Sequence, residues 1–262
     1  MNSPLLEIRG LDLSYGEARI LHGVGVEVRS GETVGLVGES GSGKSSTVRA
    51  ALRLLPPSAT VAGSVRINGR SVLDADDRAL RDIRASEVGL IQQDPRGALN
   101  PVRRIGDSLT ERLVRVHGVR LAEARRRGLD LLAAVGITRP EERLRQYPHE
   151  LSGGMLQRIV IAAALTTQPR LLLADEATSA LDVTTQAEVL SILRDQQRER
   201  DLGLLFITHD LHLAAAFCDR VCVMLHGTLV EELRGADLFR GATHPYTRAL
   251  LAAAPAIGEE QA

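Results

Sequence analysis

The chain has 262 residues, of which 44% are hydrophobic and 25% charged, an ordinary composition for one globular domain or for one domain with an insert. A formal net charge of −1, with three Tyr, three Phe and no Trp, argues against a nucleic-acid-binding protein, which needs a basic surface and rings for base stacking. No apolar run approaches the ~20 residues of a membrane span, and Met1 to Gly10 lacks the pattern of a secretory leader, so we expect a cytoplasmic protein.

From Leu5 to Val28 the chain alternates apolar and polar residues with glycine breaks, which predicts short strands in an antiparallel layer. Tyr15 lies on the apolar face of one predicted strand and ends it at Gly16. Two interpretations of Tyr15 stay open at this point. It is either a core residue or an exposed ring that can stack on a nucleotide base.

A phosphate-binding motif follows the apolar run from Thr33 to Val37 and leads into a helix-compatible run from Ser45 to Leu55. It fits G-x-x-x-x-G-K-[ST] in full over residues 38–45. A strand that turns into a helix leaves several backbone N–H groups pointing into one concavity at the positive end of the helix dipole, and this forms a cradle for an anion. The alternative is a plain Gly/Ser-rich turn, against which the complete motif in its strand–helix context argues.

Each residue type in this motif has a task in holding a nucleoside triphosphate. Glycine lets the backbone approach a phosphate, Lys44 adds a cation for the outer phosphates, and Ser45 adds a hydroxyl for Mg²⁺. The expected nucleotide-binding residues of the loop are Gly38, Glu39, Ser40, Gly41, Ser42, Gly43, Lys44, Ser45 and Ser46.

Beyond Pro56-Pro57, short strands are predicted from Gly63 to Gly69, with a turn at Asn68-Gly69, and from Val88 to Ile91. Gln93 follows the second of these strands, just before Asp94-Pro95. A glutamine at the carboxyl end of a strand can turn its side-chain carbonyl toward a metal ion or a water molecule. A solvated loop amide is the alternative for Gln93.

Apolar residues at helical spacing, among many arginines, predict a helical insert over about Ile105 to Gln146. Within it, Arg125-Arg126-Arg127 is either a phosphate contact or a solvated helix face, and we favour the solvated face. The two cysteines, Cys218 and Cys222, have a spacing that hints at metal, but a closed zinc site needs four ligands and the chain has no second pair. We favour small buried apolar side chains for both.

A second candidate anion site begins at Ser152, which opens a long helical pattern. Serine is a good N-cap, but a simple cap does not explain Gly153 and Gly154, because glycine inside a helix costs roughly 1 kcal/mol relative to alanine. Two glycines in the first turn leave backbone N–H groups accessible to an anion.

Two carboxylates, Asp175 and Glu176, follow the apolar run Leu171 to Ala174, which is typical of a central parallel strand. They fall at the carboxyl edge of the sheet, where open α/β sheets bind ligands. Asp175 is placed to hold Mg²⁺ through water, and Glu176 to orient or deprotonate an attacking water. Two surface acids without a task are the alternative.

The next predicted helix runs from Asp182 to about Arg200, and a buried strand, Leu204 to Ile207, then ends at Thr208-His209. His209 is either a structural residue or a contact to the γ-phosphate. A closing hairpin is predicted around His226-Gly227, and a short helix over His244 to Ala254.

In this order the motifs resemble the nucleotide-binding subunit of an ABC transporter, over nearly the whole chain. The resemblance rests on the phosphate loop, on Leu151-Ser152-Gly153-Gly154-Met155 as the signature, on Leu171 to Glu176, on Ser179 to Asp182 as the D-loop, and on His209 as the switch histidine. It implies an α/β P-loop NTPase with a RecA-like core, an N-terminal antiparallel β layer and an inserted helical subdomain. The implied division of residues 1–262 is a catalytic core over 1–93 and 153–240, a helical subdomain over 94–152 and a short tail over 241–262.

The resemblance also implies roles for residues that the pattern alone left open. Tyr15 would stack on adenine, and Gln93 would be a ligand of Mg²⁺ and of the attacking water, together with Ser45 and Asp175 for Mg²⁺. Glu176 would be the general base and His209 the γ-phosphate sensor. Ser152, Gly153, Gly154 and Met155 would act on ATP held by a second subunit, with Asp182 as a link across that interface.

Finer features resemble the importer ATPases for dipeptides, oligopeptides, nickel or metal chelates. They are Gln93-Asp94-Pro95, Leu99-Asn100-Pro101, the Ser152 to Arg158 run, Leu181-Asp182-Val183 and His244-Pro245-Tyr246-Thr247-Arg248. Met155-Leu156-Gln157-Arg158 and the short length are slightly more similar to the nickel and metallophore members. The subgroup implies two transmembrane permeases, an extracytoplasmic substrate-binding protein, a second ABC ATPase as partner, and a peripheral place on the cytoplasmic face of the inner membrane.

Two residues depart from the common family pattern. Met155 replaces a glutamine, as is common in this subgroup, and Ala177 replaces a proline, while both carboxylates remain. We therefore expect activity, and without a cysteine-rich extension we expect no iron–sulfur cluster. The rivals are a soluble ABC-type ATPase not coupled to transport and a P-loop kinase or GTPase, which would not need Ser152-Gly153-Gly154.

Overall fold

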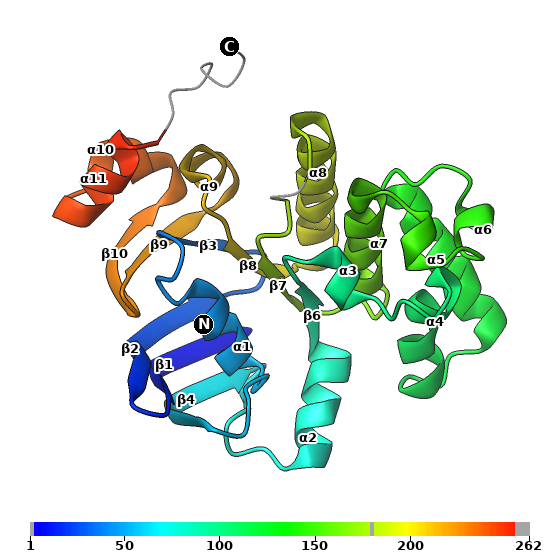
Figure 1. Cartoon of the computed structure of the whole chain (residues 1–262), viewed down its shortest axis with the longest axis horizontal. Helices are drawn as coiled ribbons and strands as arrows, with labels where there is room; N and C mark the ends of the chain where they lie inside the picture. The colour runs from blue at the N-terminus through cyan, green and yellow to red at the C-terminus, as the bar shows by residue number, and fades with distance from the viewer. Residues whose placement is uncertain (1–2, 179–180, 255–262) are drawn as a thin grey trace. The chain divides into compact units, whose positions relative to one another are not determined.

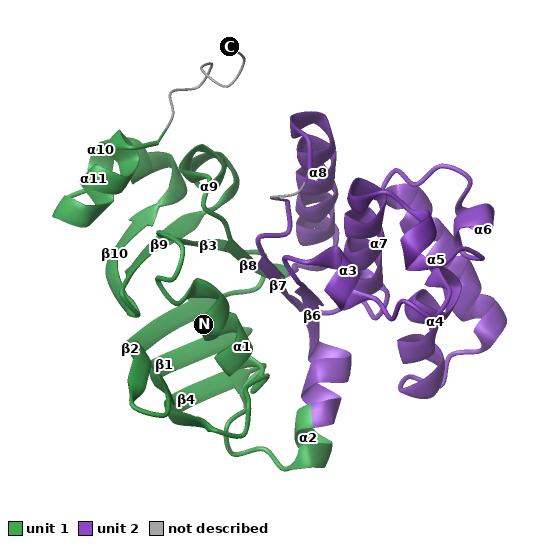
Figure 2. Cartoon of the chain, viewed as in Figure 1, with its two compact units in different colours: residues 1–80, 203–262 green, residues 81–202 purple. Residues whose placement is uncertain are grey.

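The computed structural model describes residues 3–178 and 181–254, with the element order shown in Figure 1. Ser179 and Ala180 of the predicted D-loop lie outside the described residues. The chain divides into two compact units (Figure 2). Unit 1 comprises residues 1–80 and 203–262, and unit 2 comprises residues 81–202.

The first layer of unit 1 is an antiparallel sheet with strand order β2-β1-β4-β5, as the N-terminal alternation predicts. Its strands are β1 (Leu6–Tyr15), β2 (Ala18–Val28), β4 (Ala59–Ile67) and β5 (Arg70–Ser71). Apolar residues on alternate positions of β1 are buried, so one face of this layer forms the core. β4 begins at Ala59 rather than at the predicted Gly63, because residues 59–62 also pair with β1. Gly63 (φ 101°) lies at the irregularity in this pairing, where a Cβ would come within 2.3 Å of the Gly10 carbonyl oxygen.

The second layer of unit 1 has the strand order β10-β9-β3-β8. β3 is parallel to both β8 and β9, and β9 and β10 form the predicted hairpin. The strands are β3 (Thr33–Val37), β8 (Gly203–Ile207), β9 (Arg220–Leu225) and β10 (Thr228–Arg234). The helical elements are α1 (Lys44–Ala51), α2 (Asp77–Asp82, which extends into unit 2), α9 (Leu211–Phe217), η3 (Gly235–Asp237), α10 (Leu238–Gly241) and α11 (Pro245–Ala252).

Helix α1 ends at Ala51, four residues before the predicted end at Leu55. The N–H of Arg53 donates to the carbonyl oxygen of Ala50 and the N–H of Leu54 donates to that of Arg49, while Arg53 has a φ of 52°. This pair of bonds around a left-handed residue is the Schellman motif. The backbone therefore closes the helix before Pro56 is reached.

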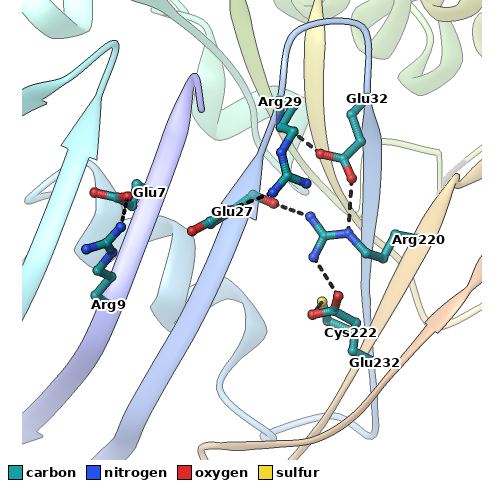
Figure 3. A network of polar contacts seen from close by, with 8 residues as sticks. All are labelled: Glu7, Arg9, Glu27, Arg29, Glu32, Arg220, Cys222 and Glu232. Atoms are coloured by element: carbon teal, nitrogen blue, oxygen red, sulfur yellow. Dashed lines mark hydrogen bonds and ion pairs between the residues drawn. The ribbon is translucent and has the colours of Figure 1, made fainter. Parts of the chain in front are cut away.

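A polar network around Arg220 ties the two layers of unit 1 together (Figure 3). The guanidinium of Arg220 bonds to Glu32 (3.0 Å) and Glu232 (2.9 Å) and donates to the backbone carbonyl of Glu27 (2.6 Å). Burial alone would lower the pKa of Arg220, but the carboxylates of Glu32 and Glu232 raise it above its ordinary value. Arg220 therefore stays charged and holds the end of β2 against β9 and β10.

Unit 2 contains two parallel strands, β6 (Val88–Ile91) and β7 (Leu171–Asp175), at the predicted positions. The stretch predicted to be helical contains α4, α5 and α6, and α4 and α5 both contact α7. The helices of this unit are η1 (Ile83–Glu87, a π-helix), α3 (Pro95–Ala98), α4 (Ile105–Arg115), α5 (Leu121–Ala134), α6 (Pro140–Arg143), η2 (Pro148–Glu150), α7 (Gly153–Leu165) and α8 (Val183–Arg200).

Candidate nucleotide-binding site

The phosphate loop of unit 1 connects β3 to α1 and depends on glycine at two close approaches. Gly38 has a φ of 146°, and a Cβ there would come within 2.2 Å of the carbonyl oxygen of Met224. At Gly43 (φ 105°) a Cβ would lie 2.8 Å from the side chain of Leu21. The loop is thus pressed against β2 and against the end of β9, in a conformation that other residues reach only with strain.

Lys44 begins α1 directly after this loop and is only 5% exposed. Its ammonium donates to the carbonyl oxygens of Gly38 (2.7 Å) and Glu39 (2.8 Å). The positive charge therefore lies against the backbone of the loop. Ser45 and Ser46 follow in the first turn of α1 and are half-buried.

His209 reaches the same sheet edge as the phosphate loop. Leu36 of β3 is paired with Ile207 of β8, so Gly38 and His209 each stand two residues beyond this pair at the carboxyl ends of neighbouring parallel strands. His209 is exposed there. Tyr15 ends β1 and is half-buried, so part of its ring is accessible.

Unit 2 brings together two residues that sequence reasoning assigned to one site. Ile91 of β6 is paired with Ala174 of β7, and two residues further on the side-chain amide of Gln93 donates to the carboxylate of Glu176 at 2.7 Å. Glu176 has a φ of 49°, which is uncommon for a residue with a side chain and indicates local strain. Strained backbone at the end of a buried strand is typical of a functional residue.

Gln157 is a residue of this region whose role sequence reasoning missed. It lies on α7 and is 1% exposed, and its amide donates to the carbonyl oxygen of Ala177 at 2.5 Å. This bond fastens α7 to the turn that carries Glu176. A polar residue among the apolar positions of a buried helix was the available signal.

The signature segment has the predicted cap, since the hydroxyl of Ser152 accepts from the N–H of Met155 at 3.3 Å. Packing does not explain its glycines. A Cβ would meet no atom within 4 Å at Gly153, and only a side-chain atom of Leu181 at 3.8 Å at Gly154. The two glycines therefore destabilise the helix without any gain in packing, and they leave its first turn uncovered. This favours the prediction that an anion can approach the backbone N–H groups there.

Asp182 caps α8 by accepting from the N–H (3.0 Å) and the hydroxyl (2.8 Å) of Thr185. These bonds, led by the one from the Thr185 N–H, lower the pKa of Asp182. Together with Ser152, Gly154 and Arg158, Asp182 lines a cavity of about 310 Å³ within unit 2. The predicted signature and the described half of the D-loop thus border one hollow.

The predicted site residues are divided between the units. Tyr15, the phosphate loop and His209 belong to unit 1, and Gln93, the signature, Asp175, Glu176 and Asp182 belong to unit 2. Both cysteines are buried free thiols, as predicted. Within the part of the chain that the structure describes, no three His, Cys, Asp or Glu side chains could hold a metal among themselves, and no helix is long and apolar enough to cross a bilayer.

A strand–glycine loop–helix that buries a lysine defines a P-loop nucleotide-binding protein. Comparison with known proteins narrows this class, because residues 21–179 match the family described as ABC transporter. The chain belongs to this family and is an ATP-binding, ATP-hydrolysing cassette of the ABC type.

Curated relatives and solved structures agree with this assignment. The chain is 47% identical over 96% of its length to a protein named probable peptide ABC transporter ATP-binding protein y4tR from Sinorhizobium fredii, covering 77% of it. It is 42% identical over 98% of its length to the oligopeptide transport ATP-binding protein OppD from Bacillus subtilis, covering 74% of it. A dimeric, ADP- and Pi-bound ATP-binding cassette, MJ0796, matches with a TM-score of 0.79 and 28% identity over 87% of this chain and 98% of that one. The α/β architecture is therefore that of an ABC cassette.

Proposed function

We propose that this chain is the ATP-hydrolysing subunit of an ABC importer that takes up peptides. One observation carries the choice of cargo, namely the 42–47% identity over nearly the whole chain to proteins named for peptide or oligopeptide transport. Nickel and metal chelates, which the Met155 to Arg158 run favours, are the alternative cargoes. Specificity resides in the other subunits of such a system, so the cargo is decided by experiment.

The roles proposed for unit 1 concern holding the nucleotide. Residues 38–46 bind the phosphates of ATP through backbone N–H groups and Lys44, and the half-exposed ring of Tyr15 stacks on adenine. His209 senses the γ-phosphate from the same edge of the sheet. The closely packed glycines and the buried ammonium support these roles.

The roles proposed for unit 2 concern hydrolysis. Glu176 is the general base that takes a proton from the attacking water, and Gln93, bonded to its carboxylate, orients Glu176 and the water. A carboxylate that is already held by an amide has a defined position for accepting that proton. The short Gln93–Glu176 bond supports this assignment.

The residues proposed for Mg²⁺ are Ser45, Gln93 and Asp175. They offer a hydroxyl oxygen, an amide oxygen and a carboxylate oxygen, which are the ligands that this hard cation prefers. Two or three such ligands suffice, because Mg²⁺ in nucleotide sites is shared with phosphate oxygens and water. The ion would neutralise charge on the transferred phosphoryl group.

We propose that Ser152, Gly153, Gly154 and Met155 complete the ATP site of a second ABC ATPase, with Asp182 at the contact between the two. The unpacked glycines at the start of α7 support a ligand outside this chain, and a dimeric cassette is among the similar structures. ATP that bridges two subunits favours the closed pair, and hydrolysis releases it. The helical subdomain, proposed as residues 94–152, would transmit this motion to two transmembrane permeases. The chain would lie at the cytoplasmic face of the inner membrane, and a substrate-binding protein would deliver the cargo.

Uptake tests the cargo and the partners. The tagged Glu176→Gln variant, purified from membranes with ATP, is expected to retain two permeases and a second ATPase. Cells that lack the chain are expected to lose uptake of a labelled oligopeptide but not of labelled nickel. Loss of nickel uptake alone would show that the transported substrate is nickel and not a peptide. Recovery of the chain without any membrane protein would favour the soluble ABC-type ATPase.

A further inference from the structure

The segment from His244 to Arg248 has no role in the mechanism above, yet it touches the phosphate loop. It forms the start of α11 in unit 1. The phenol oxygen of Tyr246 accepts a hydrogen bond from the backbone N–H of Glu39 at 3.1 Å, across 207 positions of sequence. A side chain of the C-terminal segment therefore holds the second residue of the nucleotide loop.

Tyr246 is itself anchored to β10 through Glu231. One carboxylate oxygen of Glu231 accepts from the N–H of Thr243 (2.6 Å), the hydroxyl of Thr243 (2.7 Å) and the N–H of His244 (3.2 Å). The ring nitrogen Nδ1 of His244 then caps α11 by accepting from the N–H of Tyr246 at 3.2 Å. These four hydrogen bonds fix the start of α11, and with it the phenol.

The hairpin formed by β9 and β10 also contacts the nucleotide loop directly. The N–H of Gly227, in the turn between β9 and β10, donates to the carbonyl oxygen of Ser42 at 2.9 Å. The loop is therefore braced at Ser42 by the turn of the hairpin, and at Glu39 by the helix that β10 anchors. Both braces come from the C-terminal part of unit 1.

The peptide groups of Glu39 are held from both sides. Its N–H is bonded to Tyr246, and its carbonyl oxygen accepts from the ammonium of Lys44. A phosphate that draws Lys44 toward itself weakens the second bond and leaves the first. Tyr246 is then the contact that keeps this end of the loop in place.

We propose that Tyr246 is a positioning residue for the nucleotide loop, which acts through the N–H of Glu39 and touches no phosphate itself. Through this contact the His244–Arg248 segment holds the loop in the conformation that binds ATP. The proposal rests on the assignment of residues 38–46 to ATP, and its test separates the two.

The test is the affinity for ATP, measured by equilibrium dialysis with Mg²⁺ in a Glu176→Gln background. Tyr246→Phe keeps the ring and removes only the hydroxyl, whose oxygen accepts from the N–H of Glu39. Because one neutral hydrogen bond changes an equilibrium by roughly twofold to tenfold, we expect the Kd to rise by about threefold to tenfold. With Glu176 intact, the KM for ATP is expected to rise similarly while kcat changes by less than about twofold, since the hydroxyl takes no part in the chemical step.

A double-mutant cycle separates the Tyr246–Glu39 hydrogen bond from a general loosening of α11, because only the effect of the bond depends on the Glu39 N–H. Glu39→Pro removes the N–H donor, so in that background Tyr246→Phe is expected to change the Kd by less than about 1.5-fold. Arg248→Gln is the matched control on the same helix, because the Arg248 guanidinium bonds to the Ala242 carbonyl and not to the loop. An unchanged Kd in Tyr246→Phe, or an equal effect with and without the Glu39 N–H, would overturn the proposal. An unchanged Kd in Lys44→Ala would instead overturn the assignment of the loop to ATP.

Discussion

Two pairs of parallel strands, one in each unit, carry different residues beyond their carboxyl ends. In unit 1, β3 and β8 are parallel neighbours, and the chain beyond β3 becomes a glycine-rich loop that packs closely against its neighbours at Gly38 and Gly43. In unit 2, β6 and β7 are parallel neighbours, and the chain beyond them presents the side chains of Gln93 and Glu176 in contact. By the proposed roles, the loop of unit 1 holds an anion and the Gln93–Glu176 pair of unit 2 moves a proton.

This difference determines which substitutions each edge tolerates. At Gly38 of the loop, adding a single methyl group displaces backbone, because a Cβ there would lie 2.2 Å from the carbonyl oxygen of Met224. At the Gln93–Glu176 pair, an isosteric change alters the chemistry and leaves the shape intact. Binding and hydrolysis should therefore be separable by mutation, one in each unit.

The largest effect is expected for Glu176→Gln. An amide of the same shape cannot accept the proton of the attacking water, so hydrolysis should fall by about 10²–10⁴-fold while ATP still binds. Phosphate release and equilibrium binding measure the two quantities. Glu141→Gln, an exposed change on α6, is the control that should hydrolyse ATP at the normal rate. Near-normal turnover in Glu176→Gln would remove this residue from the role of base.

The second prediction is that Gly38→Ala distorts the phosphate loop of unit 1 and weakens ATP binding. With a φ of 146° and the Met224 carbonyl 2.2 Å from the new Cβ, the loop must shift, so the Kd for ATP should rise by at least about tenfold. Gly41→Ala is the control, since a Cβ there meets no atom within 4 Å and carries only the strain of its φ of 82°, about 1–2 kcal/mol. Equal ATP affinity in the two variants would contradict the importance of the close approach.

A smaller effect is expected for Gln157→Leu, which tests whether α7 positions Glu176. The variant leaves the buried carbonyl of Ala177 without its donor, which should lower the free energy of unfolding by about 1–3 kcal/mol. Because the turn bearing Glu176 loses its tie, kcat should fall by several-fold with little change in the Kd for ATP. Denaturant unfolding and steady-state kinetics measure these changes. A loss of ATP affinity instead would mean that α7 acts on binding.

The smallest effect concerns pH and the anchor of α11. Burial would raise the pKa of Glu231, but the neighbouring hydroxyls of Thr247 and Thr243 and the N–H groups of Thr243 and His244 lower it to about 2, below its ordinary value of 4.5. A carboxyl whose pKa is lower in the folded state stabilises the fold above pH 4.5 and loses this contribution as the pH falls toward 2. The urea midpoints of the wild type and of Glu231→Gln should therefore differ most near pH 6 and converge at low pH. A difference that does not change with pH would rule out the charged anchor.

Much of the fold is predictable from sequence because its signals are local. The alternation up to Val28, the apolar runs ending at Val37 and Ala174, and the complete phosphate motif each specify a strand or a turn from neighbouring residues. The register of parallel strands then explains why Gln93 meets Glu176. The roles of the individual site residues remain proposals that the mutations above test.

Other features could not be predicted because the contacts that decide them leave no signal in the pattern of residues. Helix α1 ends at Ala51 through backbone bonds around Arg53, and no periodicity signals this end. Gln157 looks like one more position of a long helix until its partner at Ala177 is known. Tyr246 lies in a segment that resembles the importer ATPases, but its contact with Glu39 joins residues 207 positions apart.

The most direct test of the central claim is a structure of the Glu176→Gln variant with ATP and Mg²⁺. The account predicts that residues 38–46 enclose the phosphates and that Ser152 and Gly154 of a second ABC ATPase lie within hydrogen-bonding distance of the γ-phosphate. An ATP-bound assembly in which Ser152 and Gly154 lie far from any nucleotide would contradict it.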